Sequence, residues 1–496
     1  MVFLVFAICL GAFAGCKNNE TAKQHEGDPQ KQDGDGSESN ETATDKILYD
    51  KVPELDFEGY SFRVLIGTFG LDGQTLFPEE EIGDVLNDTI YLRNRKIEGR
   101  FNIEFKTSVV DLGSLQPALR KDVKAGADSY DEYMQIDRYA YTSAAEQLLY
   151  PVSDLPYVDL NQPYWCYLPN KQLTVANKLY FGFSDEMLTF FEATLPLYFN
   201  KKQAQDLGIE DLYGLVRSGD WVYDKFFETA KLAVRDADGD GQITEKDHWG
   251  IAGDGDTTYY CFWNCAGLYS VEKDKNDIPY FAIPENPKFF EIGEKVIDML
   301  NSRSGLLMNS HKTKLPSYGG PATRSAESQN AKVSFFKNGH CLFMIGTISE
   351  MVKLRDMPDD FGVLPFPKYT VDQGQYYTRV YGGFPFVVPT TVQNPEIVGA
   401  IMEAMACESR NTVIPAYFES SLQNKYSRDT DTAEMLDLII NTRLYDLGDT
   451  IWYDQIRLSY TEVFESGQNT FASFTEKNQA KYQQIIEKAV NAILGG

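Results

Sequence analysis

The sequence predicts an α/β protein built from two lobes, and two observations lead to this prediction. The chain has 496 residues, which is more than a single hydrophobic core usually serves. Short apolar runs typical of strands alternate with helical patterns, as in βαβ units that form a mostly parallel sheet. The hydrophobic content of 43% and the charged content of 24% are ordinary for a soluble globular protein, so a large core is available.

The first series of elements alternates strand and helix. We expect a strand at residues 61–66 and a helix at 84–98, where apolar side chains recur at helical spacing. A strand at 101–105 and a helix at 114–123 follow, and a strand at 133–136 completes the series.

The second series contains more strands than helices. Pro196 predicts that its strand lies at a sheet edge, because proline cannot donate to the hydrogen-bond ladder. Pro395 predicts the first position of a helix, where proline is favoured. The expected strands are 178–183, 194–200, 248–252, 341–345, 361–365 and 382–389. The expected helices are 226–234, 395–405 and a C-terminal helix that includes 482–493.

The charge of the chain excludes one class of partner. The formal net charge is −27, whereas a nucleic-acid-binding protein needs a basic surface. An acidic surface also disfavours anionic lipid headgroups. We interpret the charge as a source of solubility.

The cysteines do not predict a disulfide framework. Five of the seven lie beyond the leader, and an odd number argues against a stapled fold. Cys261 and Cys265 are spaced so that they could pair, but we expect the five to be mostly buried thiols.

The first residues predict export and lipid attachment. Residues 2–14 are apolar but too short to span a bilayer, which is typical of a secretory signal. The next residues, Phe13-Ala14-Gly15-Cys16, resemble the bacterial lipobox, in which small residues precede a cysteine that becomes lipidated. The polar stretch 17–45 lacks aromatic residues and cannot bury enough apolar area to become ordered. We therefore expect a disordered tether after Cys16.

Three local patterns occur in order along the body. The segment 197–201 reads Leu-Tyr-Phe-Asn-Lys, and 220–224 reads Asp-Trp-Val-Tyr-Asp. The segment 335–346 carries Phe, Gly and an apolar strand, and 362–367 then reads Gly-Val-Leu-Pro-Phe-Pro. In this order, and together with Cys16, the patterns resemble the extracellular solute-binding protein family 1, the receptors of ABC importers. The likeness is clearest over about residues 58–410.

This resemblance implies a periplasmic-binding-protein (Venus-flytrap) fold, type II-like, whose hinge crossings join two lobes that close on a ligand. It implies a monomeric lipoprotein on the extracellular face of the bacterial cell membrane. That protein would be no enzyme; it would capture a small solute, expected to be a carbohydrate or oligosaccharide, and deliver it to the permease subunits of an ABC importer. The expected boundaries are 1–15 for the signal peptide, 16–57 for the lipidated tether, 58–199 with 368–410 for the N-terminal lobe, and 200–367 with 411–496 for the C-terminal lobe.

The strongest chemical motif is an acidic loop at residues 236–247. Its spacing fits an EF-hand loop, with oxygen ligands at the first, third and fifth positions and Gly241 at the sixth. The strand expected after it, at 248–252, argues for a structural Ca²⁺ clamp and against a helix-opening sensor. The expected metal ligands are Asp236, Asp238, Asp240, Gln242 through its carbonyl, Thr244 and Asp247.

Most candidate ligand-binding residues lie at the ends of the expected strands or in the loops after them, because α/β sheets place ligands there. Arg379 and Tyr381 precede the strand at 382–389, Trp263 lies in an aromatic-rich loop, and Trp452 lies in the C-terminal region. Sugar sites combine aromatic faces with carboxylates, amides and arginine. The candidates are Asp137, Arg138, Tyr139, Asp185, Glu186, Trp263, Thr347, Arg379, Tyr381 and Trp452. For each of them the alternative is a structural role, as a solvated strand end or as a core ring.

Two other functions remain open at this point. A secreted glycan-processing enzyme could hide two carboxylates among 73 acidic residues, although no GxSxG or HExxH motif is present. A surface adhesion lipoprotein is the second alternative. The solute itself could also be a peptide or a polyol, since the fold does not determine the ligand.

Overall fold

A computed structural model describes residues 47–69, 71–72, 76–209, 211–301, 305–310, 326–422 and 430–496. These residues belong to one folded unit that begins at Ile47. The expected signal peptide, the expected lipidation site Cys16 and most of the expected tether lie outside the described residues.

The first sheet gathers the strands of the first predicted series. Its path is β2-β1-β4-β14-β5, and β3 pairs with the other side of β1. Strand β1 lies in the middle of the sheet, and Phe62, Val64, Leu65 and Ile66 on it are buried, which explains its nearly continuous apolar run. The bounds are β1 Tyr60–Phe69, β2 Leu71–Asp72, β3 Ile103–Asp111, β4 Glu132–Met134, β5 Leu149–Tyr150 and β14 Phe386–Pro389.

The second sheet has the order β10-β7-β11-β6-β12. Strand β6 pairs with β11 on one side and β12 on the other, so the expected edge position of this segment is wrong. The physical reason is that Pro196 precedes the strand and interrupts none of its ladder bonds. The bounds are β6 Leu197–Asn200, β7 Trp249–Gly253, β10 Leu307–Asn309, β11 Cys341–Ile345 and β12 Phe361–Leu364.

Both sheets are mixed, which refines the expectation of mostly parallel sheets. Strand β1 is parallel to β3 and β4, and β7 is parallel to β10 and β11. By contrast, β14 runs antiparallel to β4, and β6 runs antiparallel to β11. These two are the strands through which the chain passes between the sheets, so they enter against the direction of the βαβ units.

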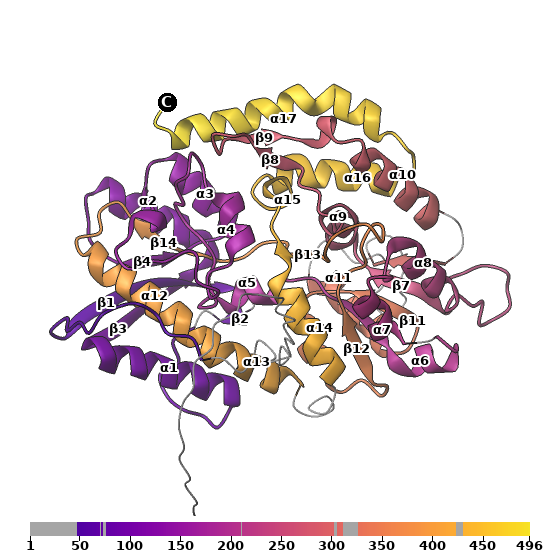
Figure 1. Cartoon of the computed structure of the whole chain (residues 1–496), viewed down its shortest axis with the longest axis horizontal. Coiled ribbons are helices and arrows are strands. Elements are labelled where there is room, and N and C mark those ends of the chain that lie inside the picture. Colours follow the sequence, from indigo (N-terminus) through magenta and orange to yellow (C-terminus); the bar gives the residue numbers. More distant parts are fainter. Residues whose placement is uncertain are drawn as a thin grey trace, which may run out of the picture. The chain divides into compact units, whose positions relative to one another are not determined.

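Helices surround the sheets (Figure 1). In the first part of the chain they are α1 Val85–Phe101, α2 Leu115–Lys124, α3 Asp137–Ala145, α4 Tyr167–Leu173 and α5 Leu188–Glu192. In the middle they are α6 Lys201–Asp206, α7 Leu212–Ser218, α8 Tyr223–Lys231, α9 Gly255–Asn264, α10 Lys288–Asn301 and α11 Ala326–Lys337. Toward the C-terminus they are α12 Pro395–Asn411, α13 Val413–Leu422, α14 Thr430–Asn441, α15 Leu447–Thr450, α16 Leu458–Ser466 and α17 Phe471–Ile493. None of the helices in the described part of the chain is long and apolar enough to cross a bilayer.

Two short ribbons complete the described strands. Strands β8 (Val271–Lys273) and β9 (Pro279–Phe281) form an antiparallel hairpin. Strands β13 (Thr378–Arg379) and β15 (Arg443–Leu444) pair in parallel, and Figure 1 shows β13 between the two large sheets. Residues 178–183, expected as a strand, form no strand, because their only ladder contact is an isolated bridge at Lys178.

The structure corrects the expected lobe boundaries at two places. The boundary at 199/200 falls inside β6, whose four residues all belong to the second sheet. Helix α13, expected in the C-terminal lobe, packs on α1 and α12 beside the first sheet, whereas α14 packs on β12 of the second. Helix α17 contacts α3 and α10, so it spans elements of both lobes (Figure 1).

The last part of the expected tether is not a tether. Val52 is buried in the core, and Leu48 exchanges two hydrogen bonds of 2.9 Å with the side chain of Asn411. Arg100 forms an ion pair with Asp50. The folded body therefore begins near Ile47, about ten residues before the sequence predicts, because a short apolar segment docks on α1 and α12.

The cysteines are buried thiols, as expected. Cys166, Cys261, Cys265, Cys341 and Cys407 are all free. Cys261 and Cys265 lie one turn apart around the C-terminal end of α9, where they share a hydrogen bond and no disulfide.

Candidate functional site

A buried ion-pair cluster lies at the C-terminal side of the second sheet. Lys332 on α11 is only 1% exposed, and its Nζ lies 2.9 Å from Asp254 Oδ2 and 3.3 Å from Glu350 Oε2. Burial favours a neutral lysine, but the two carboxylates outweigh it and raise the pKa of Lys332. Burial likewise raises the pKa of Glu350, against the opposing effect of Lys332.

Local structure holds both carboxylates in place. Asp254 is the N-cap of α9 and accepts a hydrogen bond of 2.8 Å from the Thr257 amide. Glu350 belongs to a capping box: its Oε2 accepts from the Thr347 amide at 3.0 Å at the start of the turn after β11. Thr347, a predicted ligand residue, is therefore the cap that orients Glu350.

A second ion-pair cluster lies on the connection between the lobes. Arg379 of β13 binds Asp449 of α15 with both arms of its guanidinium group, at 2.6 and 2.7 Å. Arg457 adds a third bond to the same carboxylate at 3.2 Å. Asp449 is 0% exposed, so it neutralises these arginines away from water. Burial opposes the charge of Arg379, but Asp449 outweighs it and raises the pKa of the guanidinium.

Tyr381 lies beside both clusters. Burial raises the pKa of its hydroxyl, and the charge of Glu350 raises it further, whereas Arg457 and Lys332 act in the opposite direction. The Tyr381 side chain therefore lies within electrostatic reach of both groups. We call the two ion-pair clusters together the junction network; it consists of Asp254, Lys332, Glu350, Arg379, Asp449 and Arg457.

The junction network contains buried polar atoms that lack a partner. Glu350 Oε1 and Arg457 Nε make no hydrogen bond to any residue that the structure describes. Buried polar groups in folded proteins are nearly always hydrogen-bonded. A polar ligand or water molecules at this place would satisfy these acceptors and donors.

The first lobe approaches the junction network through α3. The Arg138 guanidinium lies 5.9 Å from the centre of the Tyr453 ring, and Arg457 lies 3.8 Å from the same ring. Arg138 also covers the ring of Tyr139 at 5.1 Å. One turn further along, Tyr141 packs edge-on against Trp452 at 5.4 Å. Aromatic faces and guanidinium groups from both lobes thus meet beside the buried charges.

Several predicted ligand residues have structural roles instead. Trp263 is 1% exposed among aromatic rings of the core, and its indole N–H donates to the Phe289 carbonyl at 3.0 Å. Asp137 accepts hydrogen bonds from the Gly383 amide and the Tyr445 hydroxyl. The prediction that Trp263 and Asp137 bind the ligand is therefore wrong: Trp263 is a core residue, and Asp137 is a buried hydrogen-bond acceptor. Of the predicted ligand residues, Arg138, Tyr139, Tyr381 and Trp452 lie near the junction network.

Asp185 and Glu186 lie apart from the junction network. Asp185 forms ion pairs with Arg410 and Arg443, at 3.2 and 3.8 Å. Glu186 is buried, which raises its pKa to about 7, and Arg93 only partly opposes this shift. Its neighbour Glu132 is also buried, and its pKa is raised by burial and by the charge of Glu186.

The buried acids mark a second group of unpartnered atoms. Glu132 Oε1, Glu186 Oε2 and both amide atoms of Gln135 find no hydrogen-bond partner among the described residues. Gln135 directly follows β4, whose C-terminal end leads into α3. Of these residues only Glu186 was predicted, as a ligand-binding residue. Glu132 and Gln135 were not predicted, because polar side chains beside apolar strands resemble solvated surface residues in a sequence.

Four residues of the junction network were not predicted from the sequence: Lys332, Asp254, Asp449 and Arg457. One signal for Lys332 was available: the residue lies between Ala331 and Val333, which are both buried, on a helix beside a fully buried strand. A lysine in such a position needs a carboxylate partner. Arg457 and Asp449 carried no such signal, because their pairing depends on the π-helical turn at Tyr453–Arg457.

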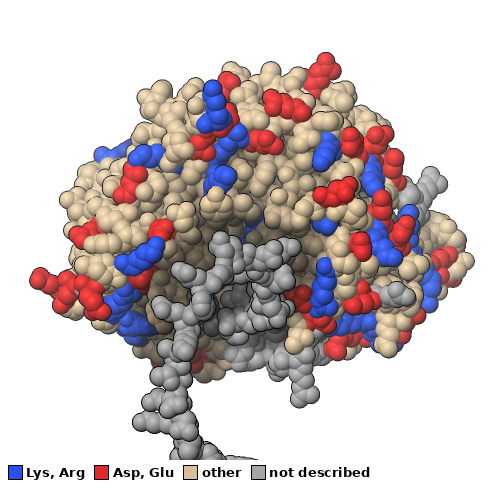
Figure 2. Space-filling view, in the orientation of Figure 1, with Lys and Arg blue, Asp and Glu red and all other residues tan. Residues whose placement is uncertain are grey.

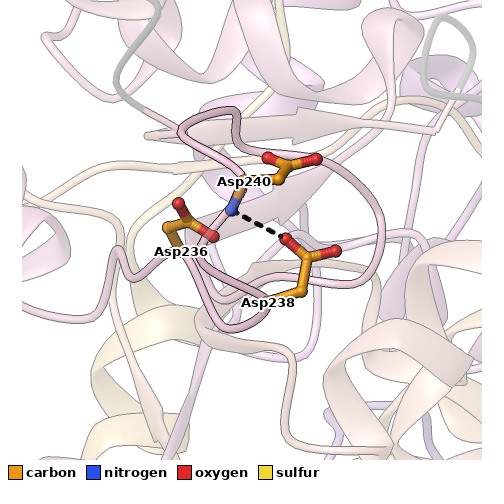
Figure 3. A group of neighbouring side chains, drawn as sticks. All are labelled: Asp236, Asp238 and Asp240. Carbon is orange, nitrogen blue, oxygen red and sulfur yellow. Dashed lines mark hydrogen bonds between the residues drawn. The ribbon is translucent and has the colours of Figure 1, made fainter.

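The acidic loop brings its first three predicted ligands together (Figure 3). Carboxylate oxygens of Asp236, Asp238 and Asp240 lie within 4.8 Å of one another. Gly241 adopts φ of 82°, the left-handed conformation that the turn requires. The loop amides point inward: Gly241 donates to Asp236 Oδ2 at 2.7 Å and Gln242 to Asp240 Oδ1 at 2.8 Å.

Asp247 closes the loop in a different way from a bidentate metal ligand. It accepts hydrogen bonds of 2.7 Å from the Ala237 and Thr244 amides, and these bonds lower its pKa. The Thr244 hydroxyl donates to the same carboxylate at 3.0 Å. In this arrangement Asp247 and Thr244 shape the loop, and the structure gathers the carboxylates of the three aspartates.

Among the described residues, the face drawn in Figure 2 has no large patch of only acidic or only basic side chains. Acidic and basic side chains are interspersed there. This distribution suits a polar neutral ligand better than a nucleic acid.

Comparison with known proteins identifies the fold. No protein-family model and no curated protein matches the chain. Among solved structures, M. tuberculosis UspC superimposes with a TM-score of 0.56 at 15% identity, covering 85% of this chain and 100% of that one. The GacH receptor of Streptomyces glaucescens, solved unliganded and with acarbose, gives 0.53 at 11% identity, covering 86% and 99%.

A third similar structure is the maltose/maltodextrin-binding domain MalE from Bdellovibrio bacteriovorus, bound to maltotriose. Its TM-score is 0.51 at 13% identity, covering 86% of this chain and 100% of that one. The chain therefore has the two-lobed periplasmic-binding-protein fold that the sequence predicts, with the junction network where its lobes meet.

Proposed function

We propose that the protein is a solute-binding protein that captures a small carbohydrate between its lobes and delivers it to an ABC importer. The observation that carries the proposal is the pair of buried, unpartnered atoms Glu350 Oε1 and Arg457 Nε at the meeting point of the lobes. Sugar hydroxyls donate and accept hydrogen bonds, so they can satisfy a carboxylate and a guanidinium together.

The aromatic side chains support a sugar over a charged solute. Tyr381, Tyr139 and Tyr453 lie partly exposed beside the network, and their rings offer apolar faces together with polar edges. The charges of the network are already paired with one another, which favours a neutral polar ligand. The similar structures solved with acarbose and maltotriose agree with this class of ligand.

A melting-shift screen tests the proposal. Monosaccharides, disaccharides and oligosaccharides are added one at a time, with polyols and short peptides as the comparison classes. A ligand at 100 times its Kd stabilises the native state by about 2.7 kcal/mol, which gives a clear rise in Tm. Stabilisation by peptides alone, or by none of the compounds, would contradict a carbohydrate-binding function.

We further propose binding without turnover. The best sugar from the screen is incubated with the protein and analysed by chromatography, and it should be recovered unchanged. Small-angle scattering should show a smaller radius of gyration with the sugar, because a ligand that contacts both lobes favours their closed arrangement. Released products would indicate a glycan-processing enzyme, and an unchanged radius without binding would favour an adhesion protein.

The membrane attachment belongs to the same proposal. A lipid on Cys16 would hold the protein on the outer face of the cell membrane beside its permease, as a monomer. In bacterial cells the chain should partition into the detergent phase and incorporate labelled palmitate, and a Cys16→Ser variant should do neither. Unchanged partitioning of that variant would rule out lipidation at Cys16.

The acidic loop is proposed to hold Ca²⁺ as a structural clamp. Asp236, Asp238 and Asp240 would supply carboxylate oxygens and Gln242 its carbonyl. The affinity expected for such an extracellular site is about 10⁻⁴–10⁻³ M. The ion would neutralise three clustered carboxylates and stiffen the link between α8 and β7.

A further inference from the structure

A separate pocket lies where the ends of α4, α12 and α14 meet β15. Its volume is about 340 Å³, which lies in the range of small-molecule sites. None of its lining residues belongs to the junction network. Arg410 lines it from the end of α12 and Asn441 from the end of α14, so an occupant would contact both helices.

The wall of this pocket is cationic. Arg410 and Arg443 both line it, and no carboxylate lines it among the residues that the structure describes. Asp185 pairs with both arginines, 3.2 Å from Arg410 and 3.8 Å from Arg443. Two other acids bind lining residues, because Asp159 accepts a hydrogen bond from Gln162 and Glu403 accepts one from Trp165. Arginine stays charged in proteins, so the single carboxylate of Asp185 is shared between two positive charges.

The two arginines retain donors that no acceptor uses. Arg443 donates through Nε to the Ile440 carbonyl at 3.0 Å and through Nη2 to Cys166 Sγ at 3.3 Å. Arg410 donates through Nη1 to Asp185. Within the described part of the chain, Arg443 Nη1 and both Nε and Nη2 of Arg410 make no hydrogen bond. The Arg443 side chain is only 7% exposed, so bulk water reaches its guanidinium poorly.

The remaining wall suits a carbon skeleton. Pro163 and Leu168 are apolar, and the ring of Tyr167 is 56% exposed at the pocket. A large exposed ring next to unsatisfied guanidinium donors favours an organic anion over a bare inorganic ion, because the ring gains contact only from an apolar body. Forked guanidinium groups match the two oxygens of a carboxylate.

We propose that this pocket is a second binding site, which takes a small organic carboxylate. Arg410 and Arg443 hold the carboxylate group, and the carbon skeleton packs against Tyr167 and Leu168. The site is independent of the carbohydrate proposed for the junction network.

Calorimetry with sodium benzoate as the probe tests this site. Benzoate is titrated into the full chain at constant ionic strength, with sodium chloride as the balancing salt. Benzyl alcohol, the neutral analogue, and inorganic phosphate are titrated in parallel. Benzoate should bind with one-to-one stoichiometry, and benzyl alcohol and phosphate should bind at least tenfold more weakly. Equal binding of benzoate and benzyl alcohol would contradict a carboxylate site, and tighter binding of phosphate would contradict the carboxylate assignment.

Two variants locate the binding. Arg410→Gln removes one guanidinium group and should lower the affinity for benzoate at least tenfold. Asn441→Asp adds a negative charge at the exposed rim of the pocket and should also lower the affinity for benzoate at least tenfold. Arg217→Gln is the matched control, because Arg217 is 40% exposed on α7 and pairs with Glu434 and Asp431 away from the pocket. Circular dichroism confirms folding of all three. Unchanged benzoate affinity in folded Arg410→Gln and Asn441→Asp would refute the site.

Discussion

The hydroxyl group of Tyr445 donates a hydrogen bond of 2.8 Å to Asp137 Oδ2, between two residues that are 308 positions apart in the chain. Asp137 begins α3 after the first sheet, and Tyr445 follows β15 on the connection between the lobes. Burial raises the pKa of Asp137, whereas the bond from Tyr445 opposes that shift. The bond therefore ties the first lobe to the connecting segment at a buried carboxylate.

Tyr445→Phe removes this bond and should lower the free energy of unfolding by about 1 kcal/mol, because Asp137 stays buried with one donor fewer. Urea unfolding followed by tryptophan fluorescence measures the change. Tyr157→Phe is the control, since its exposed hydroxyl bonds to Glu396 at 2.8 Å; its effect should stay below about 0.5 kcal/mol. Equal losses in the two variants would contradict a special role for the Asp137–Tyr445 bond.

Asp449→Asn should be far more damaging. The substitution leaves Arg379 and Arg457 buried without their shared carboxylate, and breaking a buried ion pair costs about 3–5 kcal/mol. The same unfolding measurement applies. Asp206→Asn breaks the exposed pair with Lys202 and should cost about 0.5 kcal/mol or less. A comparable small loss in Asp449→Asn would show that water reaches this carboxylate.

Tyr381→Phe and Arg138→Gln should each lower the affinity for the sugar found in the melting screen at least tenfold, which is about 1.4 kcal/mol of binding free energy. Both side chains are partly exposed beside the junction network, so the Tm of the free protein should stay within about 2 °C of the parent. Calorimetry measures the affinity, and Tyr280→Phe in the distant β8–β9 hairpin is the control.

Trp263→Ala should behave differently from these binding variants. Its ring is packed in the core, so truncation should cost about 3–5 kcal/mol of stability. A folded Trp263→Ala protein with weakened sugar binding would show that the ring faces the ligand after all.

Millimolar Ca²⁺ should raise the Tm of chelator-treated protein, and Mg²⁺ should do so less, because Mg²⁺ demands a tighter octahedral shell. Asp238→Asn and Asp240→Asn should each abolish most of the rise. Glu245→Gln is the matched control, since Glu245 lies in the same loop outside the three-aspartate group. A rise that persists in both aspartate variants would place the ion elsewhere.

Stability should fall as the pH rises from about 5 to about 8. Burial raises the pKa of Glu186 to about 7, so the folded state favours the protonated, neutral carboxyl group. The contribution of this group to the free energy of unfolding is lost as the pH rises through that value. Burial and the charge of Glu186 also raise the pKa of Glu132. Glu186→Gln should flatten the decline in Tm.

Glu146→Gln is the control for this pH dependence. Arg120 lowers the pKa of Glu146, so its contribution to stability is present above its ordinary pKa and is lost only at more acidic pH. The variant should leave the slope between about pH 5 and about pH 8 unchanged. An equal change of slope in both variants would exclude the Glu132–Glu186 pair as its origin.

Much of the fold could be read from the sequence because it depends on local periodicity. Strand β11 begins and ends at the expected residues 341 and 345, and α1 lies within a few residues of its expected range. The acidic loop could also be predicted from the sequence, since its aspartates are close neighbours in the chain. The position of β6 was not, because whether a proline lies inside a strand or just before it depends on the strands that pair with it.

The candidate site was readable only in part. Arg138 was named because it follows a strand, yet Asp137, named by the same rule, is held in structural contacts. Trp263, named from an aromatic-rich loop, is a core residue. The position of a residue at the end of a strand predicts neither the direction of its side chain nor the residues with which that side chain forms contacts.

By itself, the sequence determined the α/β class, the two lobes and the oxygen-rich loop, because alternating hydrophobicity and short-range spacing act over a few residues. Only the tertiary structure decided that Lys332 meets Asp254 and Glu350, and that Arg379 and Arg457 share Asp449. Those pairs join segments distant in the chain, and a buried charge finds its counter-charge only where packing has already brought the segments together.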